Sequence, residues 1–174
     1  MLVNLSDVLT SEERHLSLEV PLEMTCFDGG AGRFEIAEKT PVTLDVSNIE
    51  NGKARIQGHV RLTFRTACDR CLTEVPTVLD LDFERVALST ETAEEDEAAD
   101  DMDFMEDDQL NVETLVYDEI IGNWPAKVLC REDCRGICPV CGQNRNEREC
   151  GCDTFVPDPR MAVIQDIFNA NKEV

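Results

Sequence analysis

Residues 51–65, with the sequence NGKARIQGHVRLTFR, alternate between apolar and polar side chains along almost their whole length. Asn51 and Gly52 both tolerate positive φ, which favours a tight hairpin turn at this point. Side chains of a strand point to opposite faces in turn, so residues 53–65 predict the return strand of an antiparallel hairpin with one buried face. That face carries Ala54, Ile56, Gly58, Val60, Leu62 and Phe64.

The opposite face of this strand is basic. Its cations are Lys53, Arg55, Arg61 and Arg65, with His59 between them. Paired with acidic residues on neighbouring strands, they would form an ordinary exposed sheet surface. Without such partners they would form a stripe that follows the phosphates of RNA, and both interpretations stay open. A bulge at Gly58 would break the stripe.

Three other segments of the first 90 residues show the same alternation. They are residues 16–24, residues 42–46 and residues 75–88. Alternating apolar residues of this kind predict half-buried antiparallel strands. We therefore expect an antiparallel β-barrel-like or curled-sheet body over residues 1–90, with a sandwich as the alternative.

Acidic residues are concentrated in one segment that follows this body. The chain has a net charge of -21, and eleven of the eighteen residues 91–108 are Asp or Glu, with no basic residue among them. Such a segment repels itself and predicts a disordered acidic linker over residues 91–109. It is either a solvated connection or an electrostatic arm for a basic partner. Phe104 and Met105 give it an apolar anchor.

Residues 110–174 predict a helix, a cysteine-rich segment and a second helix, packed on the body. The first helix spans residues 110–121, with Asn111 in a capping position and Gly122 and Pro125 at its end. The second begins at Asp158-Pro159. The fold class expected is therefore α+β, with a β body and a C-terminal helical, zinc-knuckle segment.

The nine cysteines indicate metal binding in a reducing compartment. Their number is odd, their spacings are of the CxxC type, and the first residues lack the basic region of a secretory signal. No stretch approaches the roughly 18 apolar residues of a membrane span. We therefore expect a cytoplasmic protein with one or two structural zinc ions.

The best-defined zinc ligands are Cys138 and Cys141, in the knuckle sequence CPVCG, and Cys150 and Cys152 can complete a four-thiolate site. Another four cysteines, Cys68, Cys71, Cys130 and Cys134, can form a second site that ties the C-terminal segment to the body. Two alternatives remain: Cys134 binds the zinc held by Cys138 and Cys141, or Cys68 and Cys71 are reduced or redox-active. Cys26 is left over and is expected to be a small buried residue.

The composition of the cysteine segment favours a structural role over catalysis. A catalytic zinc usually keeps three protein ligands and an open position, often with histidine among the ligands. Residues 130–152 contain no histidine. No βαβ pattern accompanies the CxxC motifs, as a thioredoxin-like site would require. No catalytic residue is therefore predicted.

The order of these motifs resembles the YceD family, the large ribosomal RNA subunit accumulation proteins. The resemblance is carried by CxRC at residues 68–71, C-x-G-x-C-P-x-C-G at residues 134–142, Asn144, Asn146, CxC at residues 150–152 and DPR at residues 158–160. It implies a cytoplasmic, non-enzymatic factor needed for accumulation of large-subunit ribosomal RNA. Its partner would be ribosomal RNA or a large-subunit ribosomal protein, with no membrane and no small-molecule substrate.

Two other functions compete with this one. A thiol-based redox or zinc sensor acting on translation would use the cysteines as reactive groups. A zinc-dependent RNA-processing enzyme would need an open metal position, which an all-thiolate shell lacks.

Overall fold

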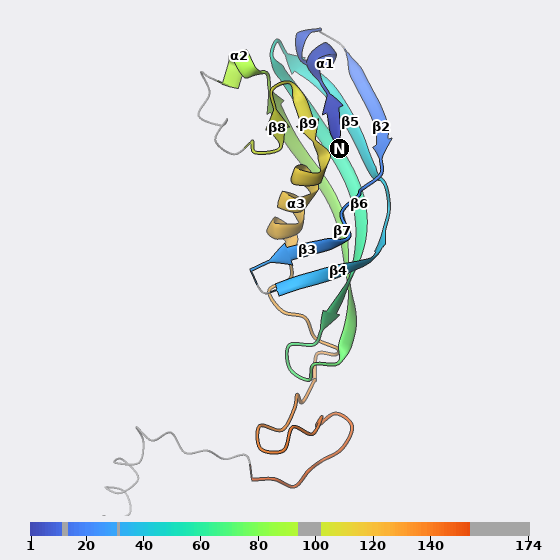
Figure 1. Cartoon of the computed structure of the whole chain (residues 1–174), viewed down its shortest axis with the longest axis vertical. Helices are drawn as coiled ribbons and strands as arrows, with labels where there is room; N and C mark the ends of the chain where they lie inside the picture. The colour runs from blue at the N-terminus through green and yellow to red at the C-terminus, as the bar shows by residue number, and fades with distance from the viewer. Residues whose placement is uncertain (12–13, 31, 94–101, 154–174) are drawn as a thin grey trace, which may run out of the picture.

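β6 (Lys53–Ala67) is the central strand of a six-stranded antiparallel sheet in the computed structural model. β7 (Glu74–Leu88) pairs with β6 along its entire length. On the other edge, the first half of β6 pairs with β5 (Val42–Glu50) and the second half with β4 (Gly32–Lys39). One long strand therefore holds two shorter strands end to end (Figure 1). The structure describes residues 1–11, 14–30, 32–93 and 102–153.

Two further strands complete this sheet and leave it open. β2 (His15–Val20) pairs with β5, and β3 (Cys26–Gly29) pairs with β4. Among the described strands β7 pairs only with β6, and helix α3 (Val112–Asn123) lies against it. The predicted curled antiparallel sheet is confirmed. It does not close into a barrel, because a helix and not another strand lies beside β7.

A second, smaller sheet joins the N-terminus to the segment before α3. Its order is β1 (Leu2–Asn4), β9 (Gln109–Asn111) and β8 (Met105–Glu106). Two short helices, α1 (Ser6–Thr10) and α2 (Thr90–Ala93), lie near the same end (Figure 1). None of the described helices is long and apolar enough to cross a membrane.

One hydrophobic core lies between the large sheet, the small sheet and α3. The alternation in the sequence predicted its strand residues correctly, since the inward positions of β5 and β6 are almost fully buried. They are Val42, Leu44, Val46, Ala54, Ile56, Val60, Leu62 and Phe64. From α3, Leu115, Val116 and Ile120 complete the core, so the predicted helix packs on the body as expected.

Gly58 does not interrupt β6. It pairs regularly with Leu44 of β5 and Phe83 of β7. A Cβ at this position would overlap Cζ and Cε2 of the Phe83 ring. The glycine therefore serves a close approach of an aromatic ring to the backbone, and the bulge considered from the sequence is absent.

The structure differs from the sequence prediction over part of the acidic linker, residues 91–109. Residues 94–101 lie outside the described residues. Residues 105–109 contribute to the hairpin of β8 and β9, and Phe104 is only 3% exposed. The hairpin forms because Phe104 and Leu110 bury their side chains in the core, which offsets the surrounding acidic charge.

Helix α3 begins where the sequence indicates. The Asn111 side chain caps it by accepting a hydrogen bond from Thr114 N at 3.3 Å. Trp124 follows the helix and packs on Phe34, with ring centroids 4.6 Å apart. The second helix expected from Asp158-Pro159 lies outside the described residues.

Candidate metal centres

The turn between β6 and β7 forms a compact cysteine knuckle. Cys68 N–H donates to Thr73 O at 2.8 Å, and Leu72 N–H donates to Cys68 O at 2.9 Å. Leu72 has φ of 61°, which turns the chain sharply after the second cysteine. The backbone N–H groups of Arg70 and Cys71 point at the Cys68 sulfur. The knuckle therefore presents two sulfur atoms and stabilises negative charge on one of them.

The motif CPVCG forms a second knuckle with the same hydrogen bonds. Cys138 N–H donates to Gln143 O at 2.8 Å, and Gly142 N–H donates to Cys138 O at 2.9 Å. Gly142 has φ of 73°, and the N–H groups of Val140 and Cys141 point at the Cys138 sulfur. The sequence singled out only this knuckle, although the shared CxxC spacing is the signal that relates the two.

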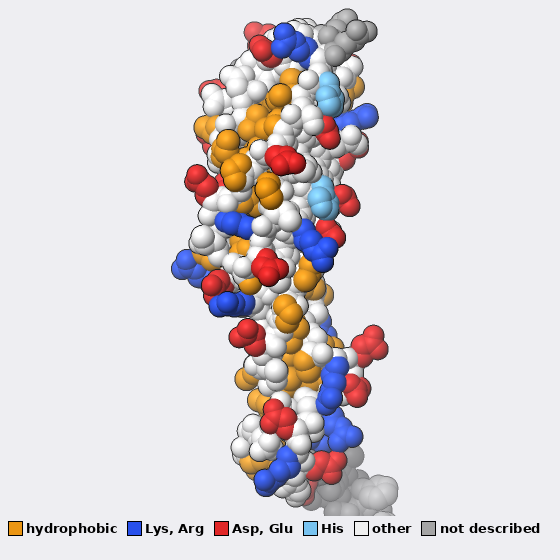
Figure 2. Space-filling model, turned by 90° about the vertical axis from the view of Figure 1, so that its right-hand side faces the viewer, with side chains coloured by type: hydrophobic (Ala, Val, Ile, Leu, Met, Phe, Trp, Pro, Cys, Tyr) orange, Lys and Arg blue, Asp and Glu red, His pale blue; other side chains and the backbone are white. Residues whose placement is uncertain are grey.

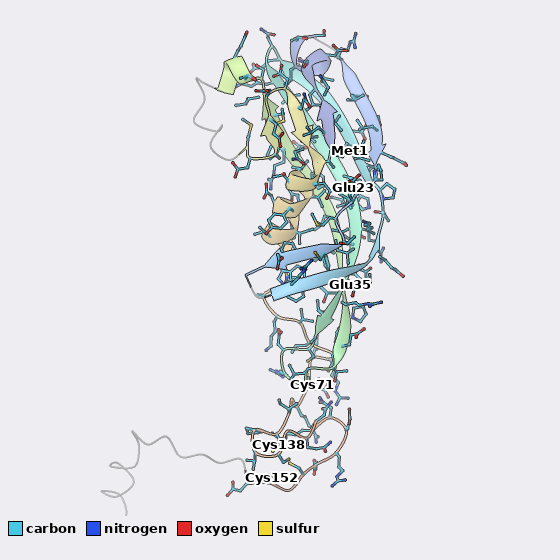
Figure 3. All side chains as sticks on the ribbon, in the orientation of Figure 1. Met1, Glu23, Glu35, Cys71, Cys138 and Cys152 are labelled. Carbon is cyan, nitrogen blue, oxygen red and sulfur yellow. The ribbon has the colours of Figure 1, made fainter. Side chains whose placement is uncertain are left out.

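The first cysteine group consists of Cys68, Cys71, Cys130 and Cys134, whose sulfur atoms all lie within 4.8 Å of one another. Cys68 Sγ is 3.8 Å from Cys134 Sγ, and Cys71 Sγ is 3.5 Å from Cys130 Sγ. Three of the four are buried, and Cys130 is exposed. The group joins the first knuckle to the segment that follows α3, as the sequence-based pairing expected (Figure 3).

The second cysteine group consists of Cys138, Cys141, Cys150 and Cys152, also with all sulfur atoms within 4.8 Å of one another. Cys138 is buried, and the other three are partly or fully exposed. Cys138 and Cys152 lie at the lower end of the molecule (Figure 3). The structure thus brings together both four-cysteine sets that the sequence suggested. It places Cys134 with Cys68, Cys71 and Cys130.

The spacing of the sulfur atoms suits a tetrahedral metal site. Zinc–sulfur bonds of about 2.3 Å in a tetrahedron separate the sulfur atoms by about 3.8 Å. A disulfide would bring two sulfur atoms to about 2.05 Å, far closer than the 3.5 Å between Cys71 and Cys130. Four soft thiolates with no histidine or carboxylate in either group favour zinc among divalent ions.

Each group contains at least one thiol that ionises readily. Burial raises the pKa of Cys68, but the N–H groups of Cys130, Arg70 and Cys71 outweigh it and lower the pKa to about 6. In the second knuckle, the N–H groups of Cys141 and Val140 lower the pKa of Cys138 to about 6. Thiolates are the metal-binding form of cysteine. Both knuckles therefore supply a ligand that needs little further deprotonation.

Other thiols of the groups resist ionisation in the absence of a cation. Burial, followed by hydrogen bonds with the neighbouring thiols, raises the pKa of Cys130 to about 12. Hydrogen bonds with the Cys141 and Cys150 thiols raise the pKa of Cys152 to about 12. Crowded sulfur atoms cannot all carry negative charge unless a positive ion lies between them.

Asn146 connects the loop of the second group to the first group. Its Nδ2 donates to Cys134 Sγ at 3.2 Å, and its Oδ1 accepts from Arg135 N–H and from Arg131 Nη2, each at 2.8 Å. Burial raises the pKa of Cys134, but the Asn146 amide and the Gly136 N–H reverse the effect and lower it. This role was not predictable from the sequence, where Asn146 stands out only by its position in the motif.

Backbone and side-chain hydrogen bonds fix the first knuckle against the segment that leads into the second. Ile137 N–H donates to Arg70 O at 3.0 Å, and Arg70 Nη1 donates to Cys134 O at 2.9 Å. Gly136 has φ of 72°, and a Cβ there would lie 2.9 Å from Arg70 O. The segment between Cys134 and Cys138 therefore passes so close to the first knuckle that only glycine fits.

A family model described as "Large ribosomal RNA subunit accumulation protein YceD" matches residues 56–168, which is more than half of the chain. The chain belongs to the YceD family. The YceD match begins within β6 and includes both cysteine groups and α3. The family's description implies a role in accumulation of large-subunit ribosomal RNA. No curated protein and no solved structure matches the chain.

The YceD chain pairs each cation of the expected RNA-binding stripe with a carboxylate on a neighbouring strand or turn. The pairs are Lys53 with Glu50 at 3.2 Å, Arg55 with Glu84 at 3.4 Å, Arg61 with Asp80 at 3.6 Å and Arg65 with Glu35 at 3.3 Å. His59 Nδ1 likewise lies 2.9 Å from Asp82 Oδ1. Figure 2 shows acidic and basic side chains interspersed on the side that carries both histidines.

Cys26 differs from its expected environment. It is partly exposed and not buried, and its sulfur accepts a hydrogen bond from Arg33 Nη2 at 3.0 Å. The difference arises because Cys26 starts β3, an edge strand whose next residue, Phe27, takes the inward position. Cys26 belongs to neither cysteine group.

Proposed function

We propose that this YceD protein is a non-enzymatic cytoplasmic factor that supports accumulation of large-subunit ribosomal RNA and is stabilised by two structural zinc ions. The family match supports the process, and the two cysteine groups support the metal. The direct partner is ribosomal RNA or a large-subunit ribosomal protein. The observation that carries the proposal is that residues 56–168, the matched range, contain all eight clustered cysteines.

A structural role for zinc follows from the ligand sets. Each group already offers four thiolates, so a bound zinc would have no open position for substrate or water. The two histidines lie on the sheet face, paired with Asp45, Asp80 and Asp82, and not beside either group. A four-coordinate, all-thiolate zinc is suited to holding chain segments together.

Zinc in the first group would join the body to the C-terminal segment. Cys68 and Cys71 follow β6, whereas Cys130 and Cys134 follow α3. Apart from the cysteines, the only described apolar residues packed around this group are the partly buried Val75 and Leu129. Because so little apolar surface is buried there, the metal would supply much of the free energy that orders the segment.

The domain organisation that accompanies this function has three parts. A β body covers residues 1–90, an acidic segment that includes β8 and the start of β9 covers residues 91–109, and residues 110–174 carry the helix and the zinc segment. The acidic segment would let the C-terminal part return to the body, where α3 enters the common core.

The metal assignment is tested by elemental analysis together with titration of free thiols. We expect two zinc ions per chain and one reactive thiol, Cys26. The matched variants are Cys26→Ser, expected to keep two zinc ions, and Cys130→Ser, expected to lose the first. Eight or nine free thiols without metal, or intramolecular disulfides in the freshly purified protein, would contradict the assignment.

The process is tested in cells that lack the protein, by the ratio of mature large-subunit to small-subunit ribosomal RNA. The intact chain and Cys26→Ser should restore this ratio. Cys71→Ser combined with Cys130→Ser should restore it poorly, because the C-terminal segment would no longer be attached to the β6–β7 turn. An unaltered ratio in cells without the protein would remove the basis of the proposed function.

A redox sensor is the second candidate, favoured by the 3.5 Å between Cys71 Sγ and the exposed Cys130 Sγ. Hydrogen peroxide would take two electrons from this pair, giving one disulfide and two waters, and zinc would leave. Stoichiometric zinc release by mild peroxide, reversed by a thiol reductant, is the result this candidate requires. Retention of zinc under those conditions would exclude it.

A further inference from the structure

Most cations of the described β body already interact with a carboxylate, a sulfur atom or a carbonyl oxygen. The four basic residues of β6 face carboxylates, as described above, and Arg14 and Arg85 pair with Asp7 and Glu119. Arg33 and Lys39 donate to Cys26 Sγ and Met24 O. A phosphate approaching this body would therefore compete with existing partners and with an acidic surface.

Cations without a carboxylate partner occur at the opposite end, in the loop formed by residues 144–149, here called the arginine loop. Both acidic residues of this loop are engaged, since Glu149 pairs with Arg135 at 2.9 Å and Glu147 accepts from Asn144 Nδ2 at 3.2 Å. Arg145 and Arg148 are exposed and form no ion pair within the described part of the chain. Two positive charges are thus left available for an external anion.

The backbone of the arginine loop is held in place by hydrogen bonds. Arg145 N–H donates to Gly136 O at 2.9 Å, and Arg148 N–H donates to Asn144 O at 3.2 Å. Asn146, at the centre of the loop, donates to Cys134 Sγ of the first cysteine group. Because these contacts exist before any ligand arrives, little ordering entropy is lost when the loop binds one.

A cavity lies beside the loop, next to the second cysteine group. It is lined by Arg135, Arg145, Glu149, Cys150, Gly151 and Cys152. Arg135 and Arg145 therefore border the same hollow, with the Arg135 guanidinium oriented by Glu149. Figure 2 shows basic side chains at this lower end of the molecule, with acidic side chains among them.

We infer that the arginine loop, and not the basic face of β6, is the surface through which the protein contacts the phosphates of ribosomal RNA. This inference rests on the proposed function, since it names the partner and the contact surface of that function. Arg145 and Arg148 supply the unpaired charge, and Arg135 borders the adjoining cavity. Because the chain carries a net charge of -21, we expect contact with RNA where cations lack carboxylate partners, as Arg145 and Arg148 do.

The test compares two full-length, zinc-loaded variants that lose the same two charges. One carries Arg145→Gln and Arg148→Gln, and the other carries Arg55→Gln and Arg61→Gln on the face of β6. Binding to labelled fragments that together cover the large-subunit ribosomal RNA is measured between about 50 and 200 mM salt. Over this range, affinity that depends on phosphate contacts falls steeply. Zinc content and far-ultraviolet circular dichroism verify that both variants are folded.

We expect the loop variant to bind RNA about tenfold more weakly. The plot of log affinity against log salt concentration should become shallower by roughly 1.4–1.8, the contribution of two phosphate contacts. The β6 variant should keep both affinity and slope within error. An equal loss in both variants would indicate a bulk charge effect and overturn the inference. A loss confined to the β6 variant would return the RNA contact to the sheet face.

Failure of the inference can be distinguished from failure of the proposed function. If the intact chain binds no ribosomal RNA fragment, the inference is wrong, and a ribosomal protein becomes the partner to identify. The ratio of large-subunit to small-subunit ribosomal RNA in complemented cells is measured for the same two variants. Normal restoration by the intact chain would leave the proposed function standing even when the RNA-binding result is negative.

Discussion

Leu72 and Gly142 occupy the same position in the two knuckles, directly after the second cysteine of each CxxC motif. Both have positive φ, a region that costs a residue with a Cβ about 1–2 kcal/mol. Leu72 is 67% exposed, so burial of its side chain returns little of that cost. The two knuckles thus share a backbone geometry that suits Gly142 in the second knuckle and strains Leu72 in the first.

This comparison predicts opposite outcomes for two reciprocal substitutions. Gly142→Leu should lower the stability of the second knuckle by about 1 kcal/mol, because it introduces the left-handed strain. Leu72→Gly should be neutral or stabilising by up to about 1 kcal/mol, since the relief of strain exceeds or balances the added freedom of the unfolded chain. Zinc retention against increasing chelator concentration measures each effect. Faster zinc loss from Leu72→Gly than from Gly142→Leu would contradict the prediction.

Glu119 introduces a pH dependence into the body. Its carboxylate is buried in α3, with Oε1 2.7 Å from Arg85 Nη2. Burial raises the pKa of Glu119, the Arg85 charge partly lowers it and Asp118 raises it further. A carboxyl whose pKa is raised on folding stabilises the fold in its protonated form. That stabilising contribution is complete below about pH 4.3, the pKa of a glutamate in the unfolded chain. It is lost as the pH rises through the higher pKa of Glu119 in the folded chain.

Glu119→Gln should therefore stabilise the protein at neutral pH, because the amide resembles the protonated carboxyl. The difference from the intact chain should vanish below about pH 4, where both side chains are neutral. Thermal melting of the two proteins, compared at each pH, measures the difference and cancels the effect of acid on the cysteine groups. Destabilisation by Glu119→Gln at neutral pH would show that the ion pair with Arg85 dominates instead.

At the scale of elements, the sequence was most informative for strands that are half-buried and regular. β6 was predicted because its apolar residues keep period two over its length, and β7 because Leu79, Leu81 and Phe83 keep the same period. The β3–β4 hairpin was not predicted. Few of its side chains are buried, and Phe27 packs on Tyr117 within α3 and on Trp124 just after it. Contacts between segments so distant in sequence leave no local pattern to recognise.

The same limit applies to the candidate metal centres. The CxxC spacing was sufficient to suggest both cysteine sets, because paired thiols at that spacing can bind one ion. The side-chain contact of Asn146 with Cys134 was not predictable, since it depends on a loop whose path is fixed only in three dimensions. Nor could the sequence determine whether the cations of β6 meet carboxylates across the sheet.

Glu113 connects helix α3 to the segment that follows β2. Its carboxylate accepts from Glu23 N–H at 2.6 Å and from Met24 N–H at 3.2 Å, which attaches the segment after β2 to the first turn of α3. Glu113→Ala should cost about 1–3 kcal/mol, because it leaves the two N–H groups unpaired and removes a favourable charge from the helix N-terminus. Urea unfolding followed by circular dichroism provides the measurement.

Glu113→Gln is the matched control for that change. The amide oxygen still accepts one hydrogen bond, but the negative charge is lost, so the cost should be smaller than for alanine. Equal unfolding free energies for the intact chain and Glu113→Ala would mean that water replaces the carboxylate without penalty and that the link to β2 is not important for stability.

At the scale of the whole molecule, order comes from two separate sources. The body has a continuous hydrophobic core that includes the sheets and α3. Where the described cysteine segment meets the β6–β7 turn, the buried apolar residues form only the small cluster around Cys68, Cys71 and Cys134. The body should therefore be stable through apolar burial, and the segment through its metal ions.

Removal of zinc should consequently unfold one part of the molecule and spare the other. With a strong chelator, we expect trypsin to cleave rapidly after Arg131, Arg135, Arg145 and Arg148, all of which lie in the cysteine segment. Trp124, the only tryptophan, packs on Phe27, Phe34 and Phe64 of the body, so its fluorescence should change little. Mass spectrometry of the fragments and tryptophan emission are recorded from the same samples.

The two readouts together distinguish a metal-dependent segment from a metal-dependent fold. Restored protection on addition of zinc, with constant tryptophan emission throughout, is the result that two independent sources of order require. A shift of the emission toward that of an exposed indole would mean that the core around Trp124 also depends on the metal. Protection that survives chelation would mean that the hydrogen bonds of Asn146 and the knuckles hold the segment without any ion.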